Sequence, residues 1–429
     1  MRGAALRRSD DGRRSAGPRT KVSARTRLRA RRPVREGAGP ADGRPPPPGA
    51  AGPGRSAPSA EGRRRGPGSD PRAGGPAGRA ARSGPDPTRL ARRSGGPDDG
   101  RRRNRRPPRT KGGVMTTHDA ALRLLGDIEK VILGQETVLR QLMITLLARG
   151  HALLEGVPGT AKTLSVRALA RGLGLDFGRV QFTPDLMPTD LVGVSVLDET
   201  QRNFRYRPGP VFTDLLLADE INRAPPKTQA ALLEAMEERQ VTVDGATRAL
   251  PAPFTVFATQ NPVEYEGTYP LPEAQVDRFL MKVVIDYPPE EAERAILDRH
   301  EAGFRADDEA TYPMGEPLTR EALLAARGAV DGVHVDERVR RYVTGIVRAT
   351  RDDQAFALGA SPRAGVALFQ AARAEAFLQG RDFVTPDDVK SLSFPVLRHR
   401  VVLTAEAEVE GRSSDDELRA LLETLEAPR

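Results

Sequence analysis

The chain has 429 residues, with no Cys, no Trp and a formal net charge of +9. The absence of Cys excludes disulfides and thiolate metal sites. No stretch approaches the ~20 consecutive apolar residues that a membrane-spanning helix requires, and no apolar core of signal-peptide length lies near the N-terminus, so we expect a cytoplasmic protein.

The charge is divided unevenly between two parts of the chain. Residues 1–114 contain 31 Lys and Arg against 9 Asp and Glu, a net charge of +22, and residues 115–429 contain 36 against 49, a net charge of −13. The first part has no Phe, Tyr or Trp, so it cannot bury enough apolar surface to offset the entropy of ordering it, and we predict a disordered arm. Two interpretations of this arm stay open: a basic segment that binds nucleic acid or an anionic surface, or translation from upstream of a true start codon at Met115.

A short apolar run, residues 151–155, precedes the sequence GVPGTAKT, and residues with helical spacing of apolar side chains follow it. Strand, glycine-rich loop and helix in this order are typical of a phosphate-binding loop. In such a loop Gly156 and Gly159 would let the backbone approach a triphosphate, Lys162 would neutralise its charge, and the Thr163 hydroxyl would hold Mg²⁺.

Ala161 departs from the usual phosphate-binding loop, which has glycine at this position. Alanine is the smallest alternative, and we expect it to be tolerated provided that its φ angle is negative. On this loop alone, a chance glycine-rich turn remains an alternative to a nucleotide site.

Three further apolar runs, residues 213–220, 254–262 and 281–288, alternate with helix-like segments, which predicts a parallel sheet covered on both faces. Asp219 and Glu220 end the first of these runs, at the edge where open parallel sheets bind ligands. An Asp there can hold Mg²⁺, and a Glu can deprotonate an attacking water. The alternative is that the two carboxylates cap the helix that follows.

Asn261 follows the second of these runs. Its amide could orient water beside a γ-phosphate, although Asn before Pro is also a common turn residue.

From about residue 290 the pattern predicts helices only, each starting with a Pro or an acidic turn. We therefore divide the chain into a disordered arm (1–114), an α/β nucleotide-binding domain (115–288) and a small all-helical domain (289–429).

Four blocks of sequence together resemble the MoxR group of AAA+ ATPases: GVPGTAKT, LLLADEINRAPPKTQAALLEAMEERQVT, ATQNPVEYEGTYPLPEAQVDRFLMK and SPRA. The similarity runs from about Ile128 to about Arg400. It implies a P-loop NTPase parallel sheet, the AAA+ core, followed by a helical lid domain. Alanine before the loop lysine is ordinary in that family.

The resemblance also implies roles for individual residues, with ATP and Mg²⁺ as cofactors. The implied nucleotide-binding residues are Gly134, Gln135, Gly156, Val157, Pro158, Gly159, Thr160, Ala161, Lys162, Thr163 and Asp219, of which Thr163 and Asp219 also hold Mg²⁺. The implied catalytic residues are Glu220 of the Walker B motif, Asn261 as sensor 1, Arg363 as sensor 2 reaching the γ-phosphate from the lid, and Arg278 as the arginine finger. Arg223 is a nearby competitor for the last role.

An arginine finger that enters a neighbouring site requires an oligomer, so the resemblance implies a ring, with a hexamer expected. Residues 192–211 and 239–254 are similar to two hairpin insertions of this AAA+ branch, and Asp244-Gly245 is a strong turn signal. We expect such hairpins to engage a substrate.

Three functions stay open at this point. The first is a chaperone-like ATPase that remodels a protein partner, for which the family suggests a protein with a von Willebrand factor A domain. The second is a nucleic-acid motor, which the −13 charge of residues 115–429 argues against. The third is the motor subunit of a magnesium-chelatase-like complex, which would share the same nucleotide site.

Overall fold

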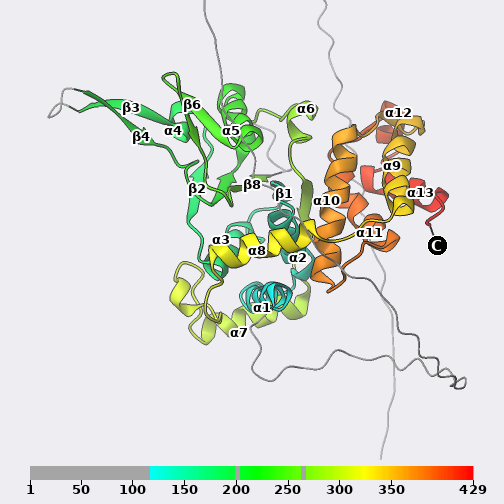
Figure 1. Ribbon diagram of the computed structural model, residues 1–429, viewed down its shortest axis with the longest axis horizontal. Helices are drawn as coiled ribbons and strands as arrows, with labels where there is room; N and C mark the ends of the chain where they lie inside the picture. The colour runs from blue at the N-terminus through cyan, green and yellow to red at the C-terminus, as the bar shows by residue number, and fades with distance from the viewer. Residues whose placement is uncertain (1–115, 199–202, 262–266, 429) are drawn as a thin grey trace, which may run out of the picture. The chain divides into compact units, whose positions relative to one another are not determined.

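The computed structural model describes residues 116–198, 203–261 and 267–428, all within one compact unit (Figure 1). The arm predicted for residues 1–114 lies outside the described residues. The predicted parallel sheet is confirmed: five strands, all parallel, in the order β2-β5-β8-β1-β9. These strands are β1 (Ala152–Gly156), β2 (Phe177–Gln181), β5 (Leu215–Asp219), β8 (Thr255–Gln260) and β9 (Met281–Ile285).

The sheet is covered on both faces, which explains why its central strands are continuous apolar runs. Leu215 and Leu217 of β5 belong to one hydrophobic cluster, whereas Leu216 and Ala218 belong to a second cluster on the opposite face. The helices before and between the strands are α1 (Thr117–Glu129), α2 (Glu136–Leu147), α3 (Lys162–Leu173), α4 (Pro188–Val192), α5 (Pro226–Glu238) and α6 (Glu273–Val276).

In this domain one strand was not predicted, and the expected start of one helix is wrong. Strand β2 was not expected, because only Phe177 and Val180 among its five residues are apolar. It is an outermost strand of the sheet, with a neighbour on one side only. The helix expected directly after Glu220 begins instead at Pro226, after a 3₁₀ turn, η1 (Ile221–Arg223). Proline disfavours helical backbone in the residue before it, so consecutive prolines delay the start of α5.

The chain after β9 is mainly helical, as predicted. Its helices are α7 (Glu290–Glu301), α8 (Arg320–Asp331), α9 (Glu337–Asp352), α10 (Pro362–Leu378), α11 (Pro386–Leu397), α12 (Ala405–Val409) and α13 (Ser414–Thr424), with a 3₁₀ turn η2 (Glu309–Thr311). The expectation of helices only is wrong in one detail, because β10 (Phe356–Leu358) and β11 (Val402–Leu403) form a small antiparallel pair.

Both expected hairpins are present. β3 (Gly193–Asp198) pairs with β4 (Asn203–Pro208), and β6 (Gln240–Val243) pairs with β7 (Ala246–Ala249). The first hairpin extends away from the sheet in Figure 1. The Arg248 guanidinium of the second hairpin lies 3.8 Å from the ring centre of Tyr206 in the first, so the two insertions are in contact. Over the described residues, none of the helices is both long and apolar enough to cross a membrane.

Candidate nucleotide site

The phosphate-binding loop joins the end of β1 to the start of α3, as predicted. Gly156 has no room for a side chain, because a Cβ there would lie 2.4 Å from the carbonyl oxygen of Ile285 in the neighbouring strand β9. Thr160 Oγ1 donates a hydrogen bond of 2.9 Å to the Val157 carbonyl and is buried inside the loop. Lys162 Nζ donates to the Gly156 carbonyl, so the loop lysine lies over the loop itself.

Ala161 has a φ angle of +61°, in the left-handed region. The condition set for tolerating alanine here, a negative φ angle, is therefore not met. This backbone conformation is the one that glycine normally supplies, and an alanine in it carries local strain of roughly 1–3 kcal/mol. The loop keeps its left-handed turn without the glycine.

A threonine of β8 holds the Asp219 carboxylate and the Glu220 backbone at the end of β5. Thr259 Oγ1 donates to Asp219 Oδ1 at 2.6 Å and accepts from the Glu220 backbone N–H at 2.8 Å. Arg179 of β2 donates to the other Asp219 oxygen at 2.6 Å. Glu220 itself has a φ angle of +56°, a strained conformation of the kind that gathers at functional sites. The Glu220 side chain also accepts a hydrogen bond of 2.9 Å from Arg223.

Asn261 directly follows β8 and is buried, with 7% of its surface exposed. Strand β8 lies between β1 and β5 in the sheet. Because the strands are parallel, their carboxyl ends share one edge, which brings Asn261 to the same edge as the phosphate-binding loop and the Asp219-Glu220 pair.

The donor set fits Mg²⁺ only in company with a nucleotide. In the part of the chain that the structure describes, no group of three His, Asp or Glu side chains is arranged to hold a metal ion. Mg²⁺ commonly keeps several waters and is bound through one or two carboxylates plus substrate phosphates. The Thr163 hydroxyl and the Asp219 carboxylate would supply the protein ligands.

A cavity of about 270 Å³ adjoins the phosphate-binding loop. Its walls come from three places: the segment after α1, the loop with the start of α3, and α7 with the residues after it. The side chains and backbone that line it include Val131, Ile132, Gln135, Gly159, Ala161, Leu164, Ile296, Arg299, His300 and Phe304. A mostly apolar cavity of this kind beside a phosphate-binding loop suits a nucleobase.

Gly134 and Gln135, which the family resemblance assigned to the adenine, hold this wall in place. Gly134 has a φ angle of +71°, and a Cβ there would lie 2.7 Å from the Ala292 Cβ of α7. Gln135 lines the cavity, and its Nε2 donates a hydrogen bond of 2.7 Å to the Asp286 carbonyl.

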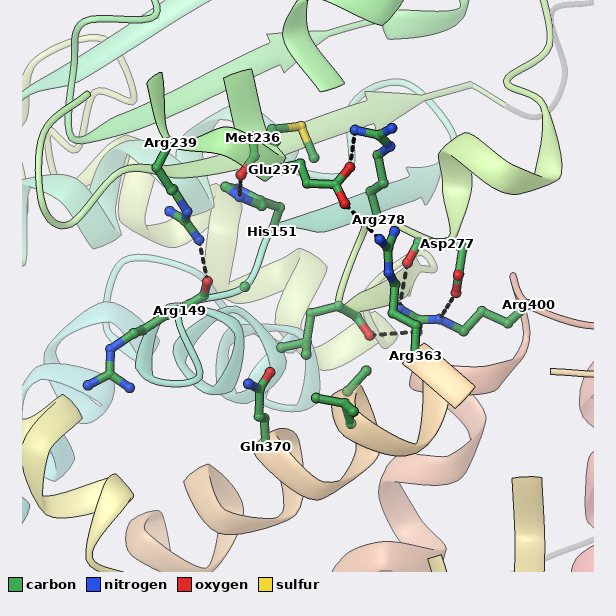
Figure 2. Close-up of a pocket in the computed structure, with 14 residues that line it drawn as sticks. Arg149, His151, Met236, Glu237, Arg239, Asp277, Arg278, Arg363, Gln370 and Arg400 are labelled. Atoms are coloured by element: carbon green, nitrogen blue, oxygen red, sulfur yellow. Dashed lines mark hydrogen bonds and ion pairs between the residues drawn. The ribbon is translucent and has the colours of Figure 1, made fainter. Parts of the chain in front are cut away.

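Arg278 and Arg363 lie together, but not at this chain's own phosphate-binding loop. Figure 2 shows both guanidiniums directed at the carboxylate of Glu237, in the last turn of α5. Arg363 Nη2 lies 2.7 Å from Glu237 Oε1, and Arg278 forms an ion pair with Glu237 Oε2. Arg278 also donates to the Leu233 carbonyl at 3.1 Å.

These arginines border a second cavity, of about 240 Å³, at the opposite edge of the sheet. Its lining includes Gly150 and His151, which precede β1, and Leu280, which precedes β9. The phosphate-binding loop follows β1, so the length of that strand, about 16 Å for five residues, separates the two edges. Within one chain, Arg363 is therefore remote from the phosphates that it was expected to reach.

The edge of the sheet that carries Arg278 and Arg363, called the arginine edge below, is anchored to the helical region by a buried ion pair. Arg400 Nε lies 2.7 Å from Asp277 Oδ1, and the same guanidinium also donates to the backbone carbonyls of Asp277, Phe279 and Leu280. Burial lowers the pKa of Arg400, and the Asp277 carboxylate opposes that shift. Arg278, one residue after Asp277, is thus fixed against the helices that carry Arg363.

Several functional candidates were not found from the sequence. Thr259 stands two residues before Asn261 in the block ATQNP and could have been noticed there. Arg179 lies in the strand that the apolar pattern missed. Glu237 and Phe304 gave no sequence signal, because a glutamate late in a helix and a single aromatic residue in a connecting segment are ordinary.

Two family models match this chain. One, described as the ATPase family associated with various cellular activities (AAA), matches residues 151–281, and an AAA lid domain model matches residues 348–421. The first match contains the phosphate-binding loop and Arg278, and the second contains Arg363.

Individual proteins are similar over most of their length. The Bacillus subtilis protein YeaC is 46% identical over 301 residues, which cover 70% of this chain and 92% of the relative. Chaperone MoxR1 of Mycobacterium tuberculosis is 42% identical over 332 residues, covering 75% of this chain and 86% of the relative. The crystal structure of a Cytophaga hutchinsonii protein with the provisional designation of ATPase has a TM-score of 0.67 and 40% identity, covering 73% of this chain and 96% of that one.

Proposed function

Because this chain belongs to the MoxR family of AAA+ ATPases, we propose that it binds ATP with Mg²⁺, hydrolyses it, and uses the energy to remodel a protein partner. One observation carries the proposal of hydrolysis. The phosphate-binding loop, the Asp219-Glu220 pair and Asn261 share one edge of the sheet, beside a cavity of about 270 Å³ that suits a nucleobase.

Each residue of this edge has a chemical task. The loop amides and Lys162 bind the phosphates. Thr163 and Asp219 would hold Mg²⁺, which would supply positive charge to the phosphate oxygens. Glu220 accepts a proton from the attacking water, and the Asn261 amide orients that water. Thr259 positions the Asp219 carboxylate and the Glu220 backbone through its two hydrogen bonds.

The arginine edge completes the site of a second copy. Arg278 and Arg363 share one carboxylate and leave a net positive charge at the edge opposite the phosphates. In a head-to-tail ring the opposite edges of successive copies meet, so both arginines would reach a neighbour's γ-phosphate. We assign the arginine finger to Arg278 and not to Arg223, since Arg223 contacts Glu220 beside its own chain's phosphate-binding loop, whereas Arg278 lies at the opposite edge. A hexamer is the ring that the family suggests.

The partner is proposed to be a protein. The relative named Chaperone MoxR1 supports a remodelling role, and a partner with a von Willebrand factor A domain is the family-based candidate. The net charge of −13 on residues 115–429 opposes the close approach of a nucleic-acid backbone.

Phosphate release from ATP by the full-length chain tests the proposed function. Lys162→Ala should abolish nucleotide binding, because it removes the cation that faces the phosphates. Glu220→Gln should bind ATP normally and hydrolyse it at least ~100-fold more slowly, the usual contribution of a general base. Normal hydrolysis by Glu220→Gln would refute the assigned base, and salt-sensitive stimulation of the wild-type rate by DNA would favour a nucleic-acid motor.

A further inference from the structure

A largely apolar groove of about 610 Å³ lies between α9 and α10. Val343 and Val347 of α9 form part of its floor, and Val366 and Phe369 of α10 form the other wall. Val366 is 56% exposed, which is unusual for a valine on a packed helix. Val366 also lines the cavity beside Arg278 and Arg363 that Figure 2 shows, so the groove and that cavity share a side chain.

Arginines border this groove along α9: Arg340, Arg348 and Arg351. Arg340 forms an ion pair with Glu337, at 2.8 Å. Among the described residues, no carboxylate lies within ion-pair distance of Arg348 or Arg351. The groove is therefore apolar inside and positive at its border, which favours an occupant with an apolar centre and acidic flanks.

Helix α7 of the same protein has that pattern. It has no buried residue, and Leu297 is 70% exposed. Glu293 and Glu301 stand one turn before and one turn after Leu297 on the same side of the helix. Within the described part of the chain, neither glutamate has an ion-pair partner.

The spacing of the charges agrees between the two surfaces. Glu293 and Glu301 are eight positions apart on α7, as Arg340 and Arg348 are on α9, and each pair spans about 12 Å at 1.5 Å per residue. Leu297 is midway between the glutamates, and Thr344, which lines the groove, is midway between the arginines. Figure 1 draws α7 below α1 and draws α9 on the right, beyond α10, so this helix does not fill its own chain's groove.

Helix α7 also lies where a neighbouring copy would arrive. Ile296 and His300 of α7 line the cavity beside the phosphate-binding loop. In the proposed ring, Arg278 and Arg363 of one copy approach this cavity on the next copy. The groove lies beside Arg363, because Pro362 and Val366 of the same helix line it. We propose that α7 of one copy docks into the α9–α10 groove of its neighbour, with Leu297 in the groove and Glu293 and Glu301 opposite Arg340 and Arg348.

This docking rests on the proposed head-to-tail ring and adds a contact that fixes the lid beside the neighbour's nucleotide. The absence of Cys from the chain allows a direct test. In full-length protein carrying Glu220→Gln, with ATP and Mg²⁺, the substitutions Arg294→Cys on α7 and Thr344→Cys in the groove are combined in one chain. Arg294 is exposed beside Leu297 and leaves the proposed contacts intact.

Treatment with a short bis-maleimide should give a ladder of cross-linked chains on a denaturing gel. The control pairs Arg294→Cys with Val409→Cys, which is 88% exposed on α12, and should give no ladder. If sedimentation shows an assembly and the first pair gives no ladder, or both pairs give one, the docking is refuted while the ring stands. If no assembly forms with ATP, the docking and the ring both fail, and phosphate release by the parent chain still tests hydrolysis.

Charge reversal gives an independent measurement. Glu293→Arg/Glu301→Arg and Arg340→Glu/Arg348→Glu should each raise the protein concentration needed for half-assembly by about tenfold, because like charges then face each other. The two double substitutions combined in one chain should restore assembly to within about threefold of the parent. Arg338→Glu/Arg341→Glu, on α9 but outside the groove lining, is the matched control. Additive losses in the combined chain would overturn the pairing.

Discussion

Two non-glycine residues around the candidate phosphate site have left-handed backbone conformations. In each case the surrounding structure holds that conformation. Ala161 has a φ angle of +61° immediately before α3, and Glu220 has a φ angle of +56° immediately after β5. Their conformations direct the loop amides and the Glu220 side chain, and neighbouring hydrogen bonds such as that from Glu220 N–H to Thr259 hold them. Strain at such positions is expected where the surrounding structure determines the geometry.

We predict that Ala161→Gly raises the free energy of unfolding by about 1 kcal/mol, because glycine adopts left-handed backbone without the Cβ clash. The rate of ATP hydrolysis should stay within about threefold of the parent, since no side-chain contact to the phosphates changes. Urea unfolding followed by circular dichroism measures the first quantity, and phosphate release measures the second.

Gly159→Ala is the matched control for this prediction. Gly159 has a φ angle of +86° and open space where a Cβ would stand, so any loss comes from the backbone and not from a clash with neighbours. It should lower the unfolding free energy by about 1 kcal/mol. Equal stability of the parent and Ala161→Gly would show that the left-handed turn at residue 161 carries no strain.

At the scale of elements, His151 joins three parts of the α/β domain. The Val256 N–H of β8 donates to His151 Nδ1 at 2.9 Å, so the proton is on Nε2, which contacts the Met236 carbonyl of α5 at 3.2 Å. Burial is the main cause that lowers the pKa of His151 to about 3, and the nearby Arg239 adds to the effect. Protonation would break the bond from Val256.

The pKa of His151 predicts a pH dependence of stability. The native state holds the neutral imidazole, whereas an unfolded histidine takes up a proton near pH 6.5. The contribution of neutral His151 to the free energy of unfolding is therefore complete above pH 6.5. It is lost as the pH falls toward 3, at up to about 1.4 kcal/mol per pH unit. Urea unfolding at pH 7 and pH 5 should show lower stability at pH 5.

His151→Gln provides the comparison. The variant has no titrating group at this position. Between pH 7 and pH 5 its free energy of unfolding should therefore fall less steeply than that of the parent, by up to about 1.4 kcal/mol per pH unit. His399, whose pKa burial also lowers, keeps part of the dependence in both proteins. An identical slope for the parent and His151→Gln would contradict the assignment.

At the scale of the whole molecule, the sheet separates the two groups of residues that the proposed ring would bring together. One edge carries the phosphate-binding loop and the carboxylates, and the other carries Arg278 and Arg363 around Glu237. Glu237 joins a helix of the α/β domain to an arginine of α10 and thereby balances two cations that would otherwise repel each other.

We predict that two inactive variants restore each other when mixed. A Lys162→Ala chain keeps its arginines, and an Arg278→Ala/Arg363→Ala chain keeps its nucleotide site. Hydrolysis should be near zero for each variant alone. In an equal mixture that assembles at random, about a quarter of the sites would combine an intact loop from one copy with intact arginines from its neighbour, so up to roughly a quarter of the parental rate should return.

Phosphate release after the two variants are mixed in ATP and Mg²⁺ measures this recovery. A mixture of Lys162→Ala with Glu220→Gln is the control and should stay inactive, since no site in it has both a lysine and a base. Full activity of the Arg278→Ala/Arg363→Ala chain alone would exclude these arginines from catalysis.

By itself the sequence determined the parallel sheet, the phosphate-binding loop, the two carboxylates after β5 and the family. These features are local: a buried strand is a run of apolar residues, and a loop that binds phosphates has glycines and a lysine at fixed spacing. The short block SPRA also indicated Arg363 as a candidate catalytic residue.

Only the tertiary structure decided where distant residues meet. It brought Glu237, Arg278 and Arg363 together at the edge away from the loop, placed α7 beside the cavity that adjoins the loop, and gave Ala161 a left-handed backbone. The physical reason is that these contacts join side chains far apart in the chain. Their geometry depends on how the helices pack against the sheet, and a sequence pattern read one segment at a time carries no record of that packing.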